Sequence, residues 1–441
     1  MSTDALQKTE AALQSAALDW KRVAALGIAI AISGNFSGWN YGLAVGGWRG
    51  MLVAALAMAF LFFILAQALA ELAAAYPQGA GFDYYVRRAW SPLLGYVCGI
   101  ALALALAIGT GLAASFAEAY WASLTGTGGW PIKLALFAIV ILLQLRGARD
   151  VAATTMITGA FVLAVLVAFC VFALPFFQVS NLGNPAQSQP LSPSMILGCI
   201  PFALFLFLGV EQCAQAAAET HDLIRTMPRA LASAVLVAVA IGLCVLCLAS
   251  GSAGVEALGK SDDPLFTAVL AHPSGFGAAL MRHVVSLGAL VALIATFFSL
   301  AYAGSRQFYH LANAGELPRW LTVTNKHRVP TGALFLTTAI GVAASAFRPD
   351  AVMVGFVFLI SVAHLLVSLS FIRLRQTQPG LARPYRAVGG TWAVAAAAVL
   401  SALVIASCYE LQPIVLGWFF GGLVSALAYF LLTRRLRMQP G

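Results

Sequence analysis

Long apolar segments separated by short polar stretches make up most of this chain. A helix that spans the hydrocarbon core of a bilayer needs about 20 residues, and apolar segments of roughly that length recur along the whole sequence. They lie at 22–46, 50–75, 91–121, 131–146, 152–178, 194–218, 228–251, 283–312, 331–347, 350–374, 390–409 and 412–433. This pattern predicts an all-α polytopic membrane protein with twelve transmembrane helices.

The composition also indicates that lipid, rather than water, surrounds most of the molecule. Hydrophobic residues make up 61% of the chain and charged residues 9%, whereas soluble domains carry about 25% charged residues. The net charge of +9 does not indicate a nucleic-acid partner, because the basic residues are spread singly over the loops. Membrane lipid is therefore the expected surface partner.

The basic residues between the apolar segments predict an orientation. If the N-terminus lies in the cytoplasm, five of the 25 Lys and Arg residues fall on the outer side and all others on the cytoplasmic side. The outer five are Arg49, Lys133, Lys260, Arg282 and Arg348. The positive-inside rule then predicts a bacterial inner (plasma) membrane protein with both termini cytoplasmic and residues 1–19 as a cytoplasmic tail.

Polar residues interrupt the first apolar segment. Between Ser33 and Asn40 there are two Gly, two Ser and two Asn residues, and these residue types weaken helices or compete for backbone hydrogen bonds. Within a membrane, freed backbone groups are tolerated where they line a cavity. The interruption therefore predicts a broken helix at a ligand site, and close packing of small residues against a neighbouring helix is the alternative.

The sixth apolar segment has a similar interruption, with Gly209 and Glu211 near its centre. The two interrupted segments are five helices apart, and an odd offset reverses the direction of crossing, which is the pattern of an inverted-topology repeat. We therefore predict a first repeat of helices 1–5 at 20–178 and a second repeat of helices 6–10 at 194–376. Helices 11 and 12, at 387–436, would be appended, and substrate would bind between the two breaks.

The predicted substrate site combines residues from both breaks. It comprises Ser33, Gly34, Asn35, Phe36, Ser37, Gly38 and Trp39 with Phe205, Phe207, Leu208, Gly209, Glu211 and Gln212. A carboxyl at mid-membrane indicates function, so Glu211 is the first candidate for proton coupling, although it could instead hold the helix in its broken shape. His364 is a weaker coupling candidate, because buried neutral histidines are common. Gln67 and Glu71 are expected to bond to neighbouring helices.

Motifs for catalysis, nucleotides and metals do not occur. We find no HExxH, P-loop, GxSxG or EF-hand pattern, and Cys244 and Cys247 lack further ligands nearby in sequence. No cofactor and no metal are therefore expected, and the chain is not expected to be an enzyme. A secondary carrier is favoured over an ATP-driven pump.

Three stretches resemble the amino acid–polyamine–organocation (APC) superfamily. Residues 70–85 resemble its AELxxxxPxxGGxYxY signature, residues 209–230 its GxE…E…R…P.A pattern, and residues 305–330 its SR…A…G.LP…P loop. The resemblance extends over about 20–435. It implies a leucine-transporter-like fold with a five-plus-five inverted repeat and alternating access, with substrate held by unwound helices 1 and 6.

Within the superfamily, residues 33–47 and 62–71 are most similar to the ethanolamine permease group. In its amino acid carriers, helix 1 N–H groups hold the carboxylate and helix 6 carbonyls hold the amine. The usual GSGIF-like run is replaced here by a bulkier one, so a small amine, ethanolamine first, is the expected imported substrate. Asn35 would then hold the hydroxyl, and Glu211 with an aromatic face the ammonium.

The resemblance also bears on coupling. Some proton-coupled relatives carry a lysine in helix 5, but Val162 lies near that position and no Lys or Arg occurs between 150 and 180. A sodium site like that of other five-plus-five carriers would use hydroxyls of helix 8, where Thr296 and Ser299 are candidates. A proton-coupled or exchange-type amino acid permease is the alternative function, and a transport-deficient membrane sensor is a more distant one.

Overall fold

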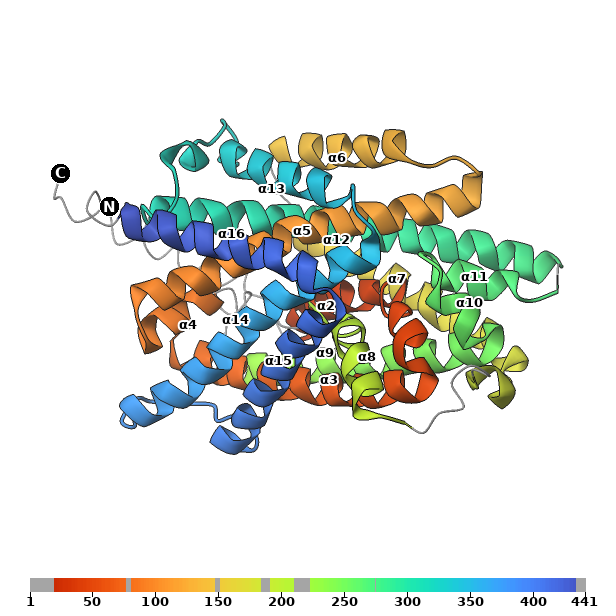
Figure 1. Cartoon of the computed structure of the whole chain (residues 1–441), viewed down its shortest axis with the longest axis horizontal. Helices are drawn as coiled ribbons and strands as arrows, with labels where there is room; N and C mark the ends of the chain where they lie inside the picture. Colours follow the sequence, from red (N-terminus) through yellow and green to blue (C-terminus); the bar gives the residue numbers. More distant parts are fainter. Residues whose placement is uncertain are drawn as a thin grey trace, which may run out of the picture.

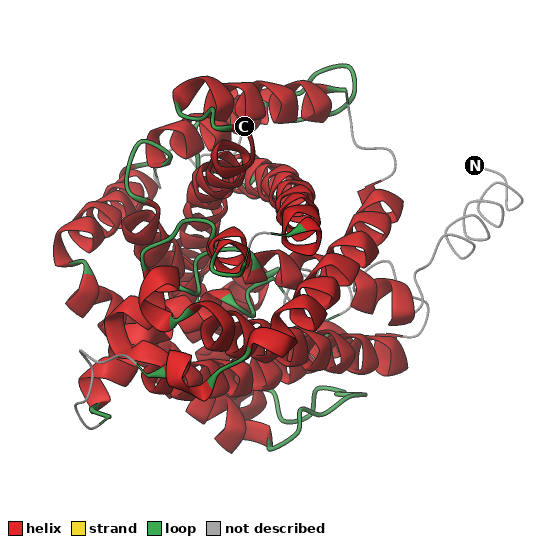
Figure 2. Cartoon of the chain, turned by 90° about the vertical axis from the view of Figure 1, so that its right-hand side faces the viewer, coloured by secondary structure: helices red, strands yellow, loops and turns green. Residues whose placement is uncertain are grey.

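The computed structural model describes residues 20–76, 81–146, 151–183, 191–209, 223–273 and 275–433, and its regular elements there are helices (Figures 1 and 2). The α-helices are α2 (Trp20–Ala31), α3 (Tyr41–Ala75), α4 (Phe82–Ala89), α5 (Pro92–Thr125), α6 (Trp130–Leu145), α7 (Val151–Ala173), α8 (Pro193–Phe205), α9 (Leu223–Ala253), α10 (Val255–Gly259), α11 (Pro264–Leu270), α12 (Phe276–Asn313), α13 (Thr331–Ala344), α14 (Pro349–Thr377), α15 (Gly390–Leu411) and α16 (Pro413–Leu432). Short 3₁₀ helices are η1 (Ile32–Asn35), η2 (Leu174–Phe176), η3 (Val179–Leu182) and η6 (Arg319–Thr322). The all-α prediction is confirmed for these residues.

Eight of the described helices are long and apolar enough to cross a membrane, namely α3, α5, α7, α9, α12, α14, α15 and α16. Four shorter apolar stretches correspond to α2 with η1, α6, α8 and α13. Every apolar segment of the sequence contains one of these helices. The chain is therefore a polytopic membrane protein, and the count of twelve spans stays a prediction.

The helices begin and end where local chemistry dictates. The Ser91 hydroxyl accepts a hydrogen bond from the Leu94 N–H at the start of α5, and Ser192 does the same for Met195 at the start of α8. Proline follows both serines, in the first helical turn where its missing N–H costs nothing. Gly126, with φ of 72°, ends α5 in the left-handed conformation that suits glycine.

Two features differ from the segments expected from the sequence. The boundary between the first two segments is a kink at Gly47 (φ 63°) within α3, so residues 41–46 continue into the next helix. The sequence analysis also did not predict α4, α10 and α11, because helices of eight residues or fewer are too short to be recognised as membrane spans.

The helices pack around a central pair, α5 and α12. On one side, α3 contacts α8 and α9, and α2 contacts α7 and α9; on the other, α14 contacts α5 and α15. Figure 1 shows α10 and α11 near the right-hand end of the bundle and α4 near the left-hand end. The long helices run between these two ends.

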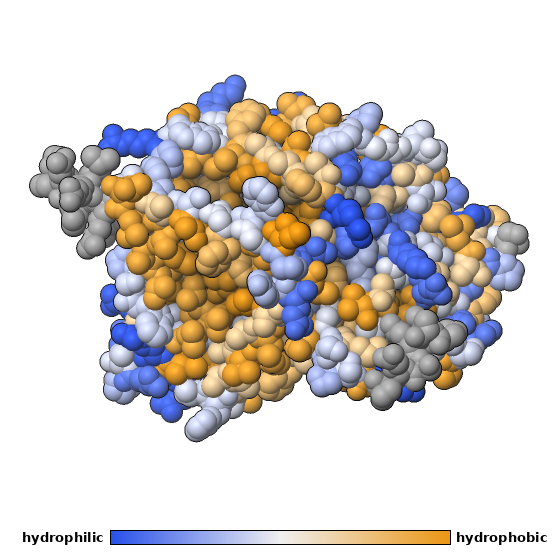
Figure 3. All heavy atoms as spheres, viewed as in Figure 1, coloured by the Kyte–Doolittle hydropathy of each residue, from blue (hydrophilic) through white to orange (hydrophobic). Residues whose placement is uncertain are grey.

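The outer surface is apolar over the helices that lie at the edge of the bundle. Trp418 and Ile414 of α16 are 80% and 79% exposed, and Figure 3 shows a broad apolar area on the face where α15 and α16 lie in Figure 1. Such a surface is stable against lipid tails but not against water. The surface therefore agrees with the membrane assignment.

Candidate functional site

The first helix is interrupted where the polar residues occur. Regular α-helix ends at Ala31, a 3₁₀ turn follows, and residues 36–40 form turns before α3 begins. The freed backbone groups find nearby partners: the Tyr120 hydroxyl and the Trp39 indole N–H donate to the carbonyls of Phe36 and Asn35. The break is thus a defined structure stabilised by side chains, as a membrane interior requires.

Helix α8 ends close to this break. It contains Pro201 and ends at Phe205, and residues 206–209 form turns with Gly209 at φ 105°. A Cβ atom on Gly34 would lie 2.6 Å from the Phe205 carbonyl oxygen. Only glycine allows this approach, so Gly34 brings the two interrupted segments into backbone contact.

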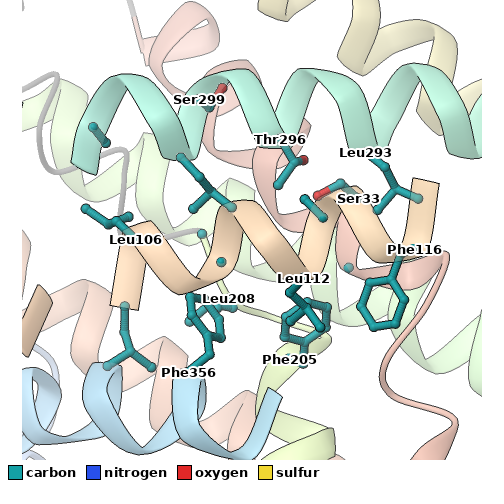
Figure 4. A pocket seen from close by; sticks show the side chains of 17 residues that line it. Ser33, Leu106, Leu112, Phe116, Phe205, Leu208, Leu293, Thr296, Ser299 and Phe356 are labelled. Atoms are coloured by element: carbon teal, nitrogen blue, oxygen red, sulfur yellow. The ribbon is translucent and has the colours of Figure 1, made fainter. Parts of the chain in front are cut away.

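A pocket lies at this contact and extends between α5, α12 and α14 (Figure 4). The space between its atoms is about 790 Å³, including the part that is open to solvent. Its lining residues come from the four helices α5, α8, α12 and α14 and from the two breaks: Ser33, Gly34, Leu106, Gly109, Leu112, Ala113, Phe116, Phe205, Leu208, Gly209, Leu293, Thr296, Ser299, Leu300, Ala303, Phe356 and Ile360. Small-molecule sites commonly have this form, a mostly apolar cavity with a few polar groups.

The polar side chains of the lining are three hydroxyls, those of Ser33, Thr296 and Ser299, and no charged side chain lines it among the residues that the structure describes. Figure 4 shows Thr296 and Ser299 on α12. The C-terminal end of α8 carries partial negative charge from its carbonyls. The polar character of the site therefore comes mainly from hydroxyls and from backbone groups at the breaks.

Three aromatic rings form one wall of the pocket. Phe205 packs edge-to-face against Phe116 of α5, with ring centroids 6.4 Å apart, and against Phe356 of α14, at 6.1 Å. The Phe205 ring also approaches the position that a Cβ on Gly38 would occupy, at 3.0 Å. The wall therefore connects the end of α8 to the break in the first helix.

The structure brings together part of the predicted site. Ser33, Gly34, Phe205, Leu208, Gly209, Thr296 and Ser299 all line the pocket. The predicted residues Asn35, Phe36, Ser37, Gly38, Trp39 and Phe207 are not among the lining residues. Glu211 and Gln212 lie outside the described residues.

The residues between Asn35 and Trp39 face other parts of the bundle. The Asn35 amide donates to the Ile32 carbonyl, and its oxygen lies near Gly242 of α9. Trp39 is fully buried and bonds back to Asn35. These side chains hold the shape of the break in this conformation.

His364 is fully buried on α14 but is not a lining residue of the pocket. Its ring lies against Phe62 and Phe82, with centroids 5.7 and 6.0 Å away. These aromatic neighbours indicate that the ring packs in the helix bundle. His364 does not contact the pocket directly, so the structure adds no support for its predicted role in proton coupling.

Sequence reasoning did not identify the lining residues of α5 and α14. Leu106, Gly109, Leu112, Phe356 and Ile360 are residue types that occur throughout the apolar segments. No motif separates them from lipid-facing or packing positions. The signal that they share is a spacing of three to four residues along each helix, at 106, 109 and 112 on α5 and at 356 and 360 on α14.

Beyond the pocket, hydrogen bonds tie the start of α3 to segment 258–263, which extends from the last two residues of α10 to the residue before α11. The Asn40 amide donates to the carbonyls of Leu258 and Ser261, at 2.8 and 2.6 Å. The Ser37 hydroxyl donates to the Asp262 carbonyl, and the Tyr41 hydroxyl to the Asp262 carboxylate at 2.5 Å. We call Ser37, Asn40, Tyr41 and segment 258–263 the hydrogen-bonded end.

Ion pairs hold the opposite end of α3 and its neighbours. Glu71 accepts two hydrogen bonds from Arg375, at 2.9 and 2.5 Å, lies 3.4 Å from Arg383 and accepts the Ala387 N–H. Arg87 of α4 makes a two-bond contact with Glu316, which raises the pKa of its guanidinium. We call these residues the ion-paired end. The expectation of bonds to neighbouring helices is confirmed for Glu71, through Arg375 of α14, whereas Gln67 bonds to Tyr385 in the loop between α14 and α15.

Sequence comparison adds an independent observation. Residues 18–430 match the sequence model of a family described as "Amino acid permease". The chain is 23% identical over 373 residues to the "Amino-acid permease RocE" of Bacillus subtilis (strain 168), covering 81% of this chain and 79% of that one. It is 26% identical over 399 residues to the "Probable GABA permease" of Pseudomonas aeruginosa (strain PAO1), covering 83% and 81%. It is also 25% identical over 355 residues to the "Gamma-aminobutyric acid permease" of B. subtilis (strain 168), covering 73% and 71%.

Proposed function

This chain belongs to the amino acid permease family, and we propose that it is a secondary transporter that carries a small amino acid by alternating access. The observation that carries the proposal is the position of the pocket, which lies where the break in the first helix meets the end of α8. In carriers built on broken helices, substrate binds at such a point because the ends of the half-helices direct their backbone dipoles toward it.

The two charged groups of an amino acid match what the pocket offers. Carbonyl groups at the C-terminal end of α8 favour an ammonium group. Backbone N–H groups and the Ser33 hydroxyl at the first break would hold the carboxylate, as the superfamily resemblance implies. The substrate would thereby be oriented without a charged side chain from the described lining.

An amino acid fits the comparisons better than ethanolamine does. The relatives named above are amino acid and GABA permeases, and each of these substrates carries a carboxylate. Asn35, which was expected to hold the hydroxyl of ethanolamine, does not line the pocket and bonds to Ile32 instead. Ethanolamine therefore remains a competitor to be tested rather than the first substrate.

Helix packing supports the inverted repeat. If α2, α3, α5, α6 and α7 correspond to α8, α9, α12, α13 and α14, each contact between the halves should have a counterpart. The contact of α2 with α9 is matched by that of α8 with α3, and the contact of α5 with α14 by that of α12 with α7. The contacts of α5 with α13 and of α12 with α6 form a further pair. Helices α15 and α16 would then be the two appended helices.

The charge distribution supports an inner-membrane orientation with both termini in the cytoplasm. In that orientation the ion-paired end faces the cytoplasm and the hydrogen-bonded end faces outward. Coupling to protons would use Glu211, whose mid-membrane carboxyl is the strongest candidate from the sequence. The Glu211→Gln variant should then lose the pH dependence of transport.

Uptake of labelled alanine into proteoliposomes tests the proposal, with and without an inward proton gradient. Leucine, GABA, ethanolamine, choline and arginine would serve as competitors. We expect saturable alanine uptake that other amino acids inhibit more strongly than ethanolamine does. Ethanolamine uptake with no amino acid uptake would overturn the substrate, and unchanged pH dependence in Glu211→Gln would remove its coupling role.

A further inference from the structure

The pocket wall opposite the two breaks consists of α5, α12 and α14, which the structure describes from end to end. Building on the proposed amino acid transport, we propose that this wall selects substrates with a neutral aliphatic side chain, and that Gly109, Leu300 and Phe356 set the upper limit on its size. The backbone groups at the breaks would hold the amino and carboxyl groups that all amino acids share. Discrimination among amino acids would then rest on this wall.

The chemistry of the wall excludes charged side chains. Thr296 and Ser299 supply its polar side chains, and the remaining lining residues from these three helices are apolar. The Ser299 hydroxyl already donates to the Ala295 carbonyl within its own helix. A guanidinium or carboxylate placed against this wall would be buried without a charged partner there, which is costly.

Gly109 lies where two side chains that line the pocket pack directly against α5. A Cβ atom on Gly109 would lie 3.0 Å from Cε2 of Phe356 and 3.1 Å from Cδ1 of Leu300. These two side chains come from different helices, and both line the pocket with Gly109. The two side chains therefore converge on Gly109, and a methyl group there would push them toward the pocket.

Comparison with the next glycine along α5 shows that this position is not simply a helix-crossing site. A Cβ on Gly111 would collide with the Gly341 carbonyl oxygen of α13, so that glycine allows two backbones to approach. The neighbours of Gly109 are the far ends of side chains instead, and these can shift to accept a methyl group. The absence of a side chain at Gly109 therefore lets two pocket-lining side chains, rather than another backbone, pack close to α5.

Phe356 is held in place by Phe205, against which it packs edge-to-face at 6.1 Å. This contact limits the ring to small shifts, so the ring forms a boundary to a substrate side chain. Its removal should open space of aromatic size, whereas a methyl group at Gly109 should reduce the space by about one carbon. The two substitutions should therefore change selectivity in opposite directions.

The test measures uptake of labelled alanine, leucine, phenylalanine and arginine into proteoliposomes containing wild type, Gly109→Ala or Phe356→Ala. Gly99→Ala, on the same helix, is the matched control for the first variant. A Cβ there would also meet side-chain atoms, of Leu311 and Gln307 at 2.9 and 3.3 Å, but none of these residues lines the pocket. Phe371→Ala is the control for the second, because Phe371 is equally buried on the same helix away from the pocket.

One methylene in an apolar site changes discrimination by about tenfold or more. We expect Gly109→Ala to lower the leucine-to-alanine uptake ratio about tenfold and Phe356→Ala to raise the phenylalanine-to-alanine ratio by at least as much, with both controls at the wild-type ratios. The ratio of two uptake rates measured on the same variant does not depend on the fraction of that variant that folds. If Gly109→Ala is inactive, Leu300→Ala, which should raise acceptance of larger side chains, provides the same test.

The outcomes separate this inference from the proposed function. If wild type transports alanine or leucine but the variants keep the ratios of their controls, the size limit is wrong and the transport function stands. If wild type prefers arginine to leucine, the aliphatic selection is wrong. If wild type transports no amino acid at all, the proposed function itself fails.

Discussion

The two ends of α3 are held to the rest of the bundle by different chemistry. At the hydrogen-bonded end, Asn40 and Ser37 bind carbonyl groups of segment 258–263, and the single carboxylate involved receives a neutral tyrosine hydroxyl. At the ion-paired end, a buried carboxylate of the same helix is shared by two arginines. Helix α3 is therefore held by hydrogen bonds at its N-terminal end and by ion pairs near its C-terminal end.

This difference indicates different tasks for the two ends. A neutral hydrogen bond contributes about 1 kcal/mol net, because water replaces it when it breaks. Removing one partner from a buried ion pair costs about 3–5 kcal/mol, because a charge is left behind without its counter-ion. We therefore expect the hydrogen-bonded end to open and close during transport and the ion-paired end to serve as a scaffold.

The largest effect should follow from Glu71→Ala at the ion-paired end. This change leaves Arg375 and Arg383 without their carboxylate, and we expect the free energy of unfolding to fall by about 3–5 kcal/mol. Denaturant unfolding of the purified protein in detergent measures it. Glu256→Ala is the control, since Glu256 forms an exposed pair with Lys260 and should lose no measurable stability. Equal stability of the two variants would contradict the scaffold role.

A smaller and local effect should follow from Asn40→Ala at the hydrogen-bonded end. Three hydrogen bonds are lost, two to segment 258–263 and one from the Gly38 N–H. At about 1 kcal/mol each, backbone amides near 258–263 should exchange with solvent roughly a hundredfold faster. Hydrogen-exchange mass spectrometry measures this local opening.

Asn325→Ala provides the matched control for that experiment. Asn325 also makes three side-chain hydrogen bonds, to Leu145, His327 and Val329, in a loop remote from segment 258–263 in sequence. Its substitution should speed exchange around 325–329 and leave 258–263 unchanged. Equal acceleration of 258–263 in both variants would show that this segment responds to general destabilisation rather than to its own contacts.

The smallest effect should follow from Tyr41→Phe, which removes one hydrogen bond to Asp262 and retains the ring. A bond to an exposed carboxylate contributes about 1.5 kcal/mol, which corresponds to roughly tenfold faster exchange near 258–263. Tyr96→Phe also removes a tyrosine hydrogen bond, to the Ala426 carbonyl, and should leave that segment unchanged. An effect of Tyr41→Phe larger than that of Asn40→Ala would reverse the ranking of these contacts.

Much of the fold could be predicted from the sequence, because lipid imposes strong rules on the chain. Helices must satisfy their own backbone groups, so long apolar segments give membrane helices. The first break could be predicted because Ser33, Gly34 and Asn35 fall within such a segment. The short helices α4, α10 and α11 could not be predicted in this way, because they are too short to span a membrane and the length requirement does not apply to them.

The site was predicted only in part, for a geometric reason. Residues 33–39 were taken together, but a 3₁₀ turn followed by further turns directs Ser33 and Gly34 to the pocket and Asn35 toward α9. Contacts between distant positions carry no local signal: Glu71 and Arg375 are 304 residues apart. For the same reason, only the placement of α5 beside α14 shows that Gly109 and Phe356 line the same pocket.

The most direct test of the account is protection of the pocket by an amino acid. In a cysteine-free background that retains uptake, Ser299→Cys places a thiol on the pocket wall, and Thr127→Cys places one in the exposed loop between α5 and α6. A maleimide should label both in purified protein. We predict that saturating leucine slows labelling about tenfold at position 299 and leaves position 127 unchanged. Equal labelling rates at position 299 with and without leucine, alanine or GABA would contradict the assignment of this pocket as the amino acid site.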